Sequence, residues 1–227
     1  MTTLSMYRIS TIRVTGADAF QFLQAQLTND LRRLENEAEM LAAWCSPKGR
    51  VIWFGTVFPL AGGYGLSAAA EMADDIVKRM TLFRIRSKVE FEVVDEGQTV
   101  DPAFLVENGY PFVGNAQVEQ FTPHMLNLDL LDAISMNKGC YPGQEVVART
   151  HYKGATKRRT LRFASSEPVS VGDKVQLEGR DIGEVLNVAG DELLAVVPVT
   201  NAGDALTING TRLQQRPLTY LDAATRQ

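Results

Sequence analysis

The chain has few of the residues that build disulfide frameworks and metal sites. Its 227 residues include two cysteines, Cys45 and Cys140, and two histidines, His124 and His151. Two cysteines do not make a disulfide framework in a chain of this length, and the four residues show no metal-ligand spacing. We therefore expect free thiols in a cytoplasmic protein, with neither a structural zinc nor a protein-held iron–sulfur cluster.

Long apolar runs and a strong net charge are also lacking. The longest uncharged stretch, residues 51–70, is interrupted by Pro59 and by Gly62 and Gly63, which predicts a β-hairpin and not a membrane span. The first residues carry no apolar segment typical of a secretory signal. The net charge of −4 does not favour bulk nucleic-acid binding. Phosphate-binding glycine loops and a nucleophile elbow are absent as well.

The hydrophobic pattern predicts an α+β fold in two parts. Helices are expected over residues 18–31 and 69–80, and strands over residues 9–14, 40–44, 50–58, 64–66 and 88–94. Residues 95–118 are rich in turn formers. Short β-rich runs then suggest a small antiparallel β-barrel-like domain; they cover residues 160–163, 174–177, 183–188, 193–197 and 206–208. We place the boundary near Gly154, giving domains of residues 1–154 and 155–227.

One octapeptide, hereafter the 138–145 motif, is the most informative segment. It reads Lys138-Gly139-Cys140-Tyr141-Pro142-Gly143-Gln144-Glu145, with Arg149 four residues further on. Pro142 suits the first turn of a helix, because it lacks an N–H and has a fixed φ. Cys140 would then precede a helix N-terminus, where negative charge is favoured, and we interpret it as a functional thiol. The alternative is that Cys140 is a small buried hydrophobic residue.

The 138–145 motif resembles the signature of the YgfZ family, folate-binding proteins similar to the glycine cleavage T-protein. Three further stretches agree with this resemblance and occur in the family's order. They are residues 15–18 leading into residues 22–30, residues 42–50, and residues 107–111 with Gly114. The resemblance implies a T-protein/YgfZ-like folate-binding domain with a shortened middle region, followed by the small β-domain.

The resemblance also implies a function and a set of site residues. Tetrahydrofolate or a related reduced folate would be the cofactor. The role would be to support iron–sulfur enzymes, including those that thiolate tRNA, so the partners would be iron–sulfur proteins or their assembly machinery. Besides the thiol of Cys140, the expected cofactor-binding residues are Glu107, Lys138, Gly139, Tyr141, Gly143, Gln144, Glu145 and Arg149.

Two of these residues also have simpler interpretations. A carboxylate such as Glu107 accepts two adjacent hydrogen bonds from a pterin ring N–H and its 2-amino group, but Glu107 is equally interpreted as a solvated residue before a turn. Arg149 follows Glu145 by four residues, a spacing that permits an ion pair on one helix face.

Two other functions stay open. A folate-dependent one-carbon transferase is the first, although the essential aspartate of the T-protein has no acidic match in residues 48–54. A non-enzymatic scaffold without a folate site is the second, because the shortened middle region would have removed folate contacts.

Two basic runs add an electrostatic expectation. Residues 78–88 hold five Lys or Arg and residues 149–162 hold six, and neither run contains an acid. Such runs are usually solvated surface, but they also create local positive fields that suit the glutamate tail of a folate or RNA phosphate. Few aromatic residues accompany them, which argues against RNA stacking.

Overall fold

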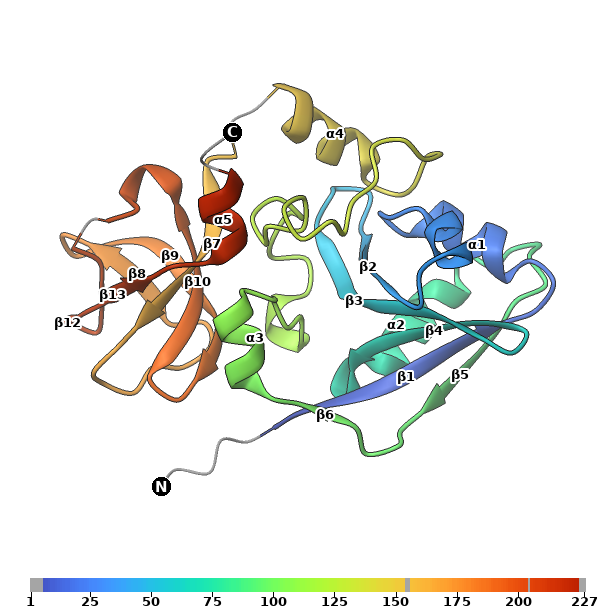
Figure 1. Ribbon diagram of the computed structural model, residues 1–227, viewed down its shortest axis with the longest axis horizontal. Coiled ribbons are helices and arrows are strands. Elements are labelled where there is room, and N and C mark those ends of the chain that lie inside the picture. Colours follow the sequence, from blue (N-terminus) through green and yellow to red (C-terminus); the bar gives the residue numbers. More distant parts are fainter. Residues whose placement is uncertain (1–5, 154–155, 204, 225–227) are drawn as a thin grey trace.

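The computed structural model describes residues 6–153, 156–203 and 205–224. It contains two antiparallel sheets at opposite ends of the molecule, with α3 and a series of turns between them (Figure 1). The α+β class predicted from the sequence is therefore confirmed. Within the described residues, no helix is long and apolar enough to cross a membrane.

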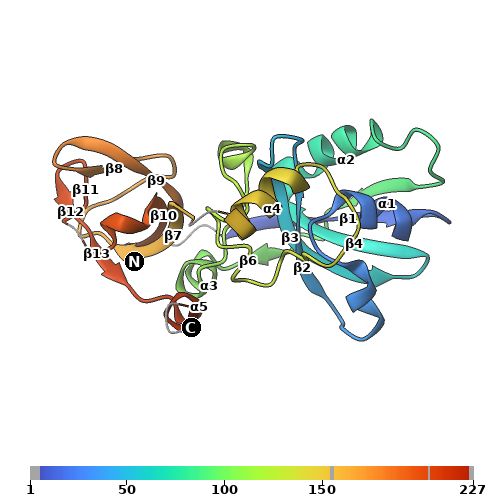
Figure 2. The same cartoon turned by 90° about the horizontal axis from the view of Figure 1, so that it is seen from above.

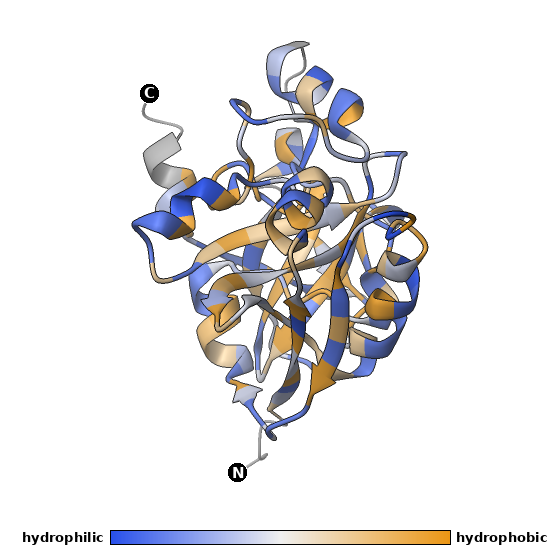
Figure 3. Ribbon diagram, turned by 90° about the vertical axis from the view of Figure 1, so that its right-hand side faces the viewer, coloured by the Kyte–Doolittle hydropathy of each residue, from blue (hydrophilic) through white to orange (hydrophobic). Residues whose placement is uncertain are grey.

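The first sheet has the strand order β2-β3-β4-β1-β5, and β6 pairs with β1 beside this path. The strands are β1 (Tyr7–Thr15), β2 (Met40–Cys45), β3 (Val51–Leu60), β4 (Gly63–Ala69), β5 (Glu90–Val94) and β6 (Thr99–Val100). The hairpin expected in residues 51–70 is confirmed by the pairing of β3 with β4. Buried and less buried residues alternate along β1, as expected when one face of a strand is buried, whereas β2 and the first half of β3 are buried almost continuously (Figure 3 shows the hydropathy of the residues).

Helices α1 (Ala19–Gln26) and α2 (Ala73–Thr81) supply apolar residues to the core of this sheet. Leu23 of α1 and Met80 of α2 are fully buried against Ile12 and Leu66. The predicted helix over residues 18–31 is too long, because Leu27 takes an extended backbone and pairs with Trp44. Residues 31–35 form a short 3-10 helix instead.

The segment between the sheets contains a helix that the sequence analysis missed. Helix α3 (Pro102–Asn108) begins after Asp101, whose side chain accepts a hydrogen bond from the backbone N–H of Ala103. Gly109 ends it in the left-handed region with φ 68°. The sequence analysis described residues 95–118 only as rich in turn formers, although an acidic cap, a proline at the first position and a terminal glycine were all visible in the sequence.

The second sheet has the strand order β12-β11-β8-β9-β10-β7-β13. The strands are β7 (Arg158–Ala164), β8 (Lys174–Leu177), β9 (Arg180–Ala189), β10 (Glu192–Pro198), β11 (Thr207–Ile208), β12 (Thr211–Arg212) and β13 (Gln214–Arg216), followed by α5 (Thr219–Ala224). Four of the five predicted β-rich runs fall within one of these strands, and the fifth, residues 206–208, begins one residue before β11. The predicted boundary, residues 154 and 155, lies outside the described residues.

One apolar cluster joins the two sheets. It combines Phe54 of β3 and Val106 of α3 with Leu186 of β9 and Leu194 of β10. Polar contacts cross the same junction, because the side-chain amide of Asn187 both accepts from the backbone N–H of Phe112 and donates to its carbonyl. The middle segment is therefore the packing layer between the sheets (Figure 2).

Candidate functional site

The 138–145 motif forms a loop that leads into α4 (Gln144–Lys153). The helix begins two residues later than predicted, because Gly143 takes φ 79° and its carbonyl accepts the N–H groups of Val146 and Val147. A Cβ atom on Gly143 would lie 2.5 Å from the carbonyl oxygen of Ser46 and 2.8 Å from Cα of Gly49. A glycine is thus required where the loop crosses the β2–β3 turn.

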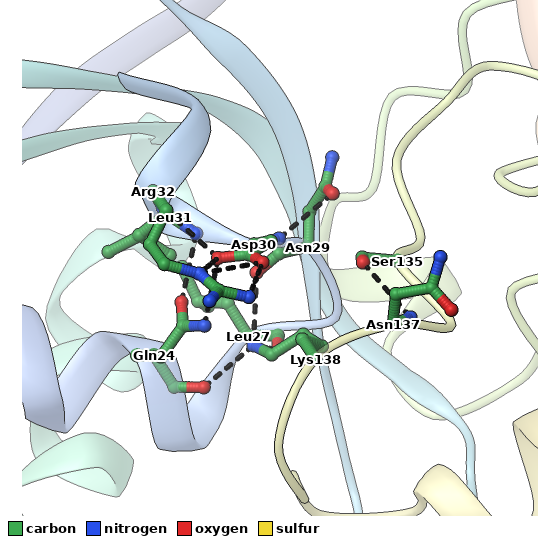
Figure 4. A network of polar contacts seen from close by, with 9 residues as sticks. All are labelled: Gln24, Leu27, Asn29, Asp30, Leu31, Arg32, Ser135, Asn137 and Lys138. Atoms are coloured by element: carbon green, nitrogen blue, oxygen red, sulfur yellow. Dashed lines mark hydrogen bonds and ion pairs between the residues drawn. The ribbon is translucent and has the colours of Figure 1, made fainter. Parts of the chain in front are cut away.

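Lys138 ties the loop to the C-terminal end of α1. Its ammonium nitrogen donates to the carbonyl oxygens of Gln24 at 2.6 Å, Leu27 at 2.6 Å and Asn29 at 3.0 Å (Figure 4). The last carbonyls of a helix lack partners within it and attract cations. Burial lowers the pKa of Lys138 to about 8. The structure therefore gives this residue a positioning role that the sequence analysis did not anticipate.

Asp30 extends the same network. Its carboxylate accepts hydrogen bonds from the guanidinium and backbone N–H of Arg32 and from the amide of Gln24. The side-chain hydrogen bonds from Arg32 hold the pKa of Asp30 well below its usual range. The negative charge stands near Lys138 and favours its charged form.

The two cysteines lie in contrasting surroundings. Cys140 is exposed at the surface of the motif loop, whereas Cys45 is buried at the end of β2. Burial raises the pKa of the Cys45 thiol to about 12, so this thiol is held in its protonated form. Cys140 is the accessible thiol of the two.

Tyr141 follows Cys140 and turns inward. Its side chain is buried, and its ring centroid lies 5.4 Å from the ammonium nitrogen of Lys138. The hydroxyl group has no hydrogen-bond partner among the described residues. Burial raises its pKa. Tyr141 and Lys138 thus anchor the loop from inside and leave Cys140 at the surface.

The remaining motif residues face outward or have room around them. Gly139 has open space where a Cβ would be added, Gln144 is half-buried, and Glu145 and Arg149 are exposed. The ion pair that the spacing of Glu145 and Arg149 permits is not formed in the described part of the chain.

Glu107 lies apart from the motif. It is exposed near the end of α3, and its backbone carbonyl accepts a hydrogen bond from Arg162. Figure 1 places α3 and α4 on opposite sides of the middle segment. The structure therefore does not bring Glu107 together with the 138–145 motif.

A cavity of about 350 Å³ lies between the first sheet and the α3 segment. Its aromatic lining comes from Phe54 of β3 and from Phe104, Tyr110 and Phe112. Glu39, just before β2, contributes a carboxylate, and Thr56, Ser67 and Tyr110 are the hydroxyl-bearing residues of the lining. The sequence analysis did not assign these residues to a site, because the cavity forms only where residues 104–112 pack against strands of the first sheet.

Three of the six basic residues in the run 149–162 bind partners within the fold. Arg159 forms a two-point ion pair with Asp129, at 2.9 and 2.8 Å, and Arg162 pairs with Glu192. Arg158 donates to the carbonyl of Ile182. These three arginines therefore have partners within the fold, and binding of an anionic ligand along this run stays a prediction.

Similarity to solved structures identifies the class of fold. The chain resembles the crystal structure of glycine cleavage system aminomethyltransferase T from Bartonella henselae, with a TM-score of 0.75. The match covers 95% of this chain and 84% of that chain at 15% sequence identity. The fold is therefore of the aminomethyltransferase T type, as the resemblance in sequence implied.

Curated proteins of similar sequence indicate one group within this class of fold. The tRNA-modifying protein YgfZ of Sodalis glossinidius is 25% identical over 80% of this chain and 77% of its own length. The YgfZ protein of Escherichia coli O157:H7 is 26% identical over 86% of this chain, and an uncharacterized protein of Haemophilus influenzae is 27% identical over 77% of it. No protein-family model matches the chain. These comparisons confirm the resemblance to the YgfZ family.

Proposed function

We propose that this protein binds a reduced folate and supports the activity of iron–sulfur enzymes, including enzymes that modify tRNA. The observation that carries the folate part is a T-protein-like fold with an aromatic-lined cavity between its first sheet and α3. The tRNA part is supported by relatives named tRNA-modifying protein YgfZ.

The cavity suits the chemistry of a pterin. Flat aromatic side chains such as Phe54 and Tyr110 offer faces for a planar ring. Glu39 offers a carboxylate, which accepts two adjacent hydrogen bonds from the pterin ring N–H and amino group. The resemblance assigns this role to Glu107, which does not line the cavity. Glu39 and Glu107 are therefore competing anchors.

Calorimetric titration of the purified chain with tetrahydrofolate tests the proposal. We expect wild-type protein to bind, and the variant of the true anchor, Glu39→Gln or Glu107→Gln, to bind about ten- to hundredfold more weakly, because a charge-assisted contact contributes roughly 1.5–3 kcal/mol. The other variant is the matched control. Absence of binding by wild type would favour the scaffold hypothesis.

The one-carbon transferase is the second candidate, and the composition of β3 argues against it. The strand runs Val51–Leu60 and contains no acidic residue, whereas the resemblance places the essential T-protein aspartate in this strand. An assay for conversion of a reduced folate carrying a one-carbon group separates the hypotheses. Turnover by the purified chain would establish the transferase.

In this proposal, Cys140 is the residue through which the protein supports iron–sulfur enzymes. Lys138 and Tyr141 hold its loop, while the thiol stays exposed. We expect Cys140→Ser to keep the fold and the folate affinity, yet to fail to restore iron–sulfur enzyme activity in cells that lack the protein. Cys45→Ser, at the buried thiol, controls for loss of a cysteine as such. Full restoration by Cys140→Ser would remove the thiol from the mechanism.

A further inference from the structure

One face of the first sheet points away from α1 and α2. Along β1, Ser10, Ile12 and Val14 are buried, and the residues between them are half-buried. Successive side chains of a strand point to opposite faces of the sheet. Ile9 and Arg13 therefore share the second face. Because Ile9 lines the cavity of about 350 Å³ described above, Arg13 lies on the same face as this cavity, further along β1.

The strand register connects Arg13 with Glu39 across this face. Glu39 directly precedes β2, whose first residue pairs with Val57, so Glu39 lies beside Phe58. Phe58 pairs with Gly65, and Gly65 pairs with Arg13. Neighbouring strands lie about 4.8 Å apart, so three spacings separate the backbones of Glu39 and Arg13 by about 14 Å. A carboxylate and a guanidinium thus stand at the two ends of a row that crosses β2, β3, β4 and β1 (Figure 1).

An aromatic ring lies between these two charged residues. A Cβ atom added to Gly65 would fall 2.4 Å from ring atoms of Phe58, so the ring of Phe58 covers this glycine. The side chain of Phe58 is half-buried. It therefore offers a flat apolar face between the two ends of the row, and a second aromatic ring can stack on such a face.

Arg13 has hydrogen-bonding capacity that the fold does not use. Its Nε atom is buried and has no hydrogen-bond partner in the described part of the chain. Its ion pair with Glu92 is long, at 3.5 Å. The strands of the first sheet contain one other cation, Arg8, which lies on the opposite face of β1 and pairs with Asp95. A guanidinium binds a carboxylate through two parallel hydrogen bonds, so Arg13 is suited to an anionic group that reaches this face.

The charge beyond Arg13 is negative. Arg13 pairs with Glu92 of the edge strand β5, and Thr15 pairs with Glu90 of the same strand. Both glutamates are exposed. The basic runs of residues 78–88 and 149–162 contribute no residue to the strands of this sheet. Like charges placed together oppose binding, so the surface suits one anionic group at Arg13 and disfavours a longer chain of carboxylates.

We propose that Arg13 binds the terminal glutamate of a monoglutamyl reduced folate whose pterin ring is held by Glu39. The inference rests on the proposed function, with Glu39 as the pterin anchor, and adds the orientation of the ligand and the residue that recognises its tail. A folate has the pterin donors at one end, an aminobenzoyl ring in the middle and the glutamate carboxylates at the other end. Glu39, Phe58 and Arg13 follow the same order across the sheet.

The test compares two ligands by calorimetric titration, tetrahydrofolate and a tetrahydropterin that lacks the aminobenzoylglutamate. We expect Arg13→Gln to weaken tetrahydrofolate binding about five- to tenfold, because a charge-assisted contact is lost, and to leave tetrahydropterin binding unchanged. Arg13→Lys should retain part of the affinity for tetrahydrofolate. Glu39→Gln should weaken the binding of both ligands. Arg8→Gln is the matched control, because it removes an arginine from the opposite face of the same strand.

Glu92→Gln separates recognition of the tail from a merely structural ion pair. It removes the carboxylate that competes for Arg13, so tetrahydrofolate should bind as tightly as to wild type or more tightly. A structural role for the pair would make Glu92→Gln and Arg13→Gln equally harmful. A polyglutamylated tetrahydrofolate should bind no more tightly than the monoglutamate, because its further carboxylates approach Glu90 and Glu92.

Three results would overturn the assignment of Arg13 while tetrahydrofolate binding itself persists. They are equal tetrahydrofolate affinity of wild type and Arg13→Gln, equal loss of both ligands in that variant, and tighter binding of the polyglutamylated form that weakens with added salt. Sensitivity of tetrahydrofolate binding to Glu107→Gln and not to Glu39→Gln would overturn it as well. No binding of either ligand by wild type would end both this inference and the proposed folate binding.

Discussion

Lys138 shows how one buried cation fixes a surface loop. Three backbone carbonyls accept its ammonium protons, and removing the donor leaves them without that partner. We expect Lys138→Met to lower the free energy of unfolding by about 1–3 kcal/mol, the usual cost of leaving a buried polar group without its hydrogen-bond partner. Urea denaturation measures this change.

Lys48→Met is the control, because Lys48 is an exposed lysine in the adjacent turn. Its replacement should alter the free energy of unfolding by less than about 0.5 kcal/mol. Equal stabilities of the two variants would contradict the anchoring role of Lys138.

His124 makes stability depend on pH. The side chain is buried, neither ring nitrogen has a partner among the described residues, and burial lowers its pKa below the usual 6.5. As the pH falls below 6.5, the histidine is protonated in the unfolded chain before it is protonated in the folded chain. The contribution of neutral His124 to the free energy of unfolding is therefore present above pH 6.5 and is lost as the pH falls. This loss reaches at most about 1.4 kcal/mol per pH unit.

Denaturation of wild type and His124→Leu between pH 7 and pH 5 checks this expectation. The variant should show a flatter dependence of the unfolding free energy on pH. The same slope in wild type and His124→Leu would assign the acid sensitivity to other groups.

At the scale of elements, the start of α4 depends on one of the two glycines in the 138–145 motif. Gly143 combines φ 79° with backbone atoms closer than 3 Å to an added Cβ, whereas Gly139 has open space around it. We expect Gly143→Ala to cost about 2 kcal/mol or more through backbone strain and steric overlap. Gly139→Ala should be nearly neutral.

Thermal unfolding of both alanine variants shows which of the two glycines is needed for the stability of the fold. A drop in the melting temperature for Gly143→Ala alone is the expected result. Similar losses for both variants would show that loop conformation, and not contact with the turn between Ser46 and Gly49, decides the stability. Loss of iron–sulfur enzyme support by a stable Gly139→Ala would assign Gly139 to the functional surface.

At the scale of the whole molecule, the shared core predicts a single unfolding transition. Phe54, Val106, Leu186 and Leu194 belong to one buried cluster that spans both sheets, so neither sheet keeps its packing when the other unfolds. Scanning calorimetry should therefore give equal calorimetric and van't Hoff enthalpies. Two separate transitions would show that the sheets are independent units.

Asn187→Ala probes the same junction with a smaller change. The variant loses two hydrogen bonds to the backbone of Phe112, each of which contributes about 0.5–1.5 kcal/mol. We expect the single transition to move to lower temperature without splitting. Asn115→Ala, at an exposed asparagine, is the control and should leave the transition in place.

Local sequence determined most of the secondary structure. The β3–β4 hairpin and the strands of the second sheet follow from short-range alternation and turn residues, which act within a few positions. The caps of α3 are equally local, and the helix was missed because the surrounding turn formers were given more weight. The 138–145 motif and its resemblance to the YgfZ family are also visible in sequence order.

Only the tertiary structure decided how the site is arranged. Long-range contacts end α1 at Gln26 and supply the carbonyls that hold Lys138, more than 100 residues away in sequence. Glu107 and the motif lie apart because α3 packs against the second sheet, while the motif loop packs on α1 and the β2–β3 turn. The different exposure of Cys45 and Cys140 is also a tertiary property. Whether a thiol is buried depends on what packs against it, and no local pattern specifies that.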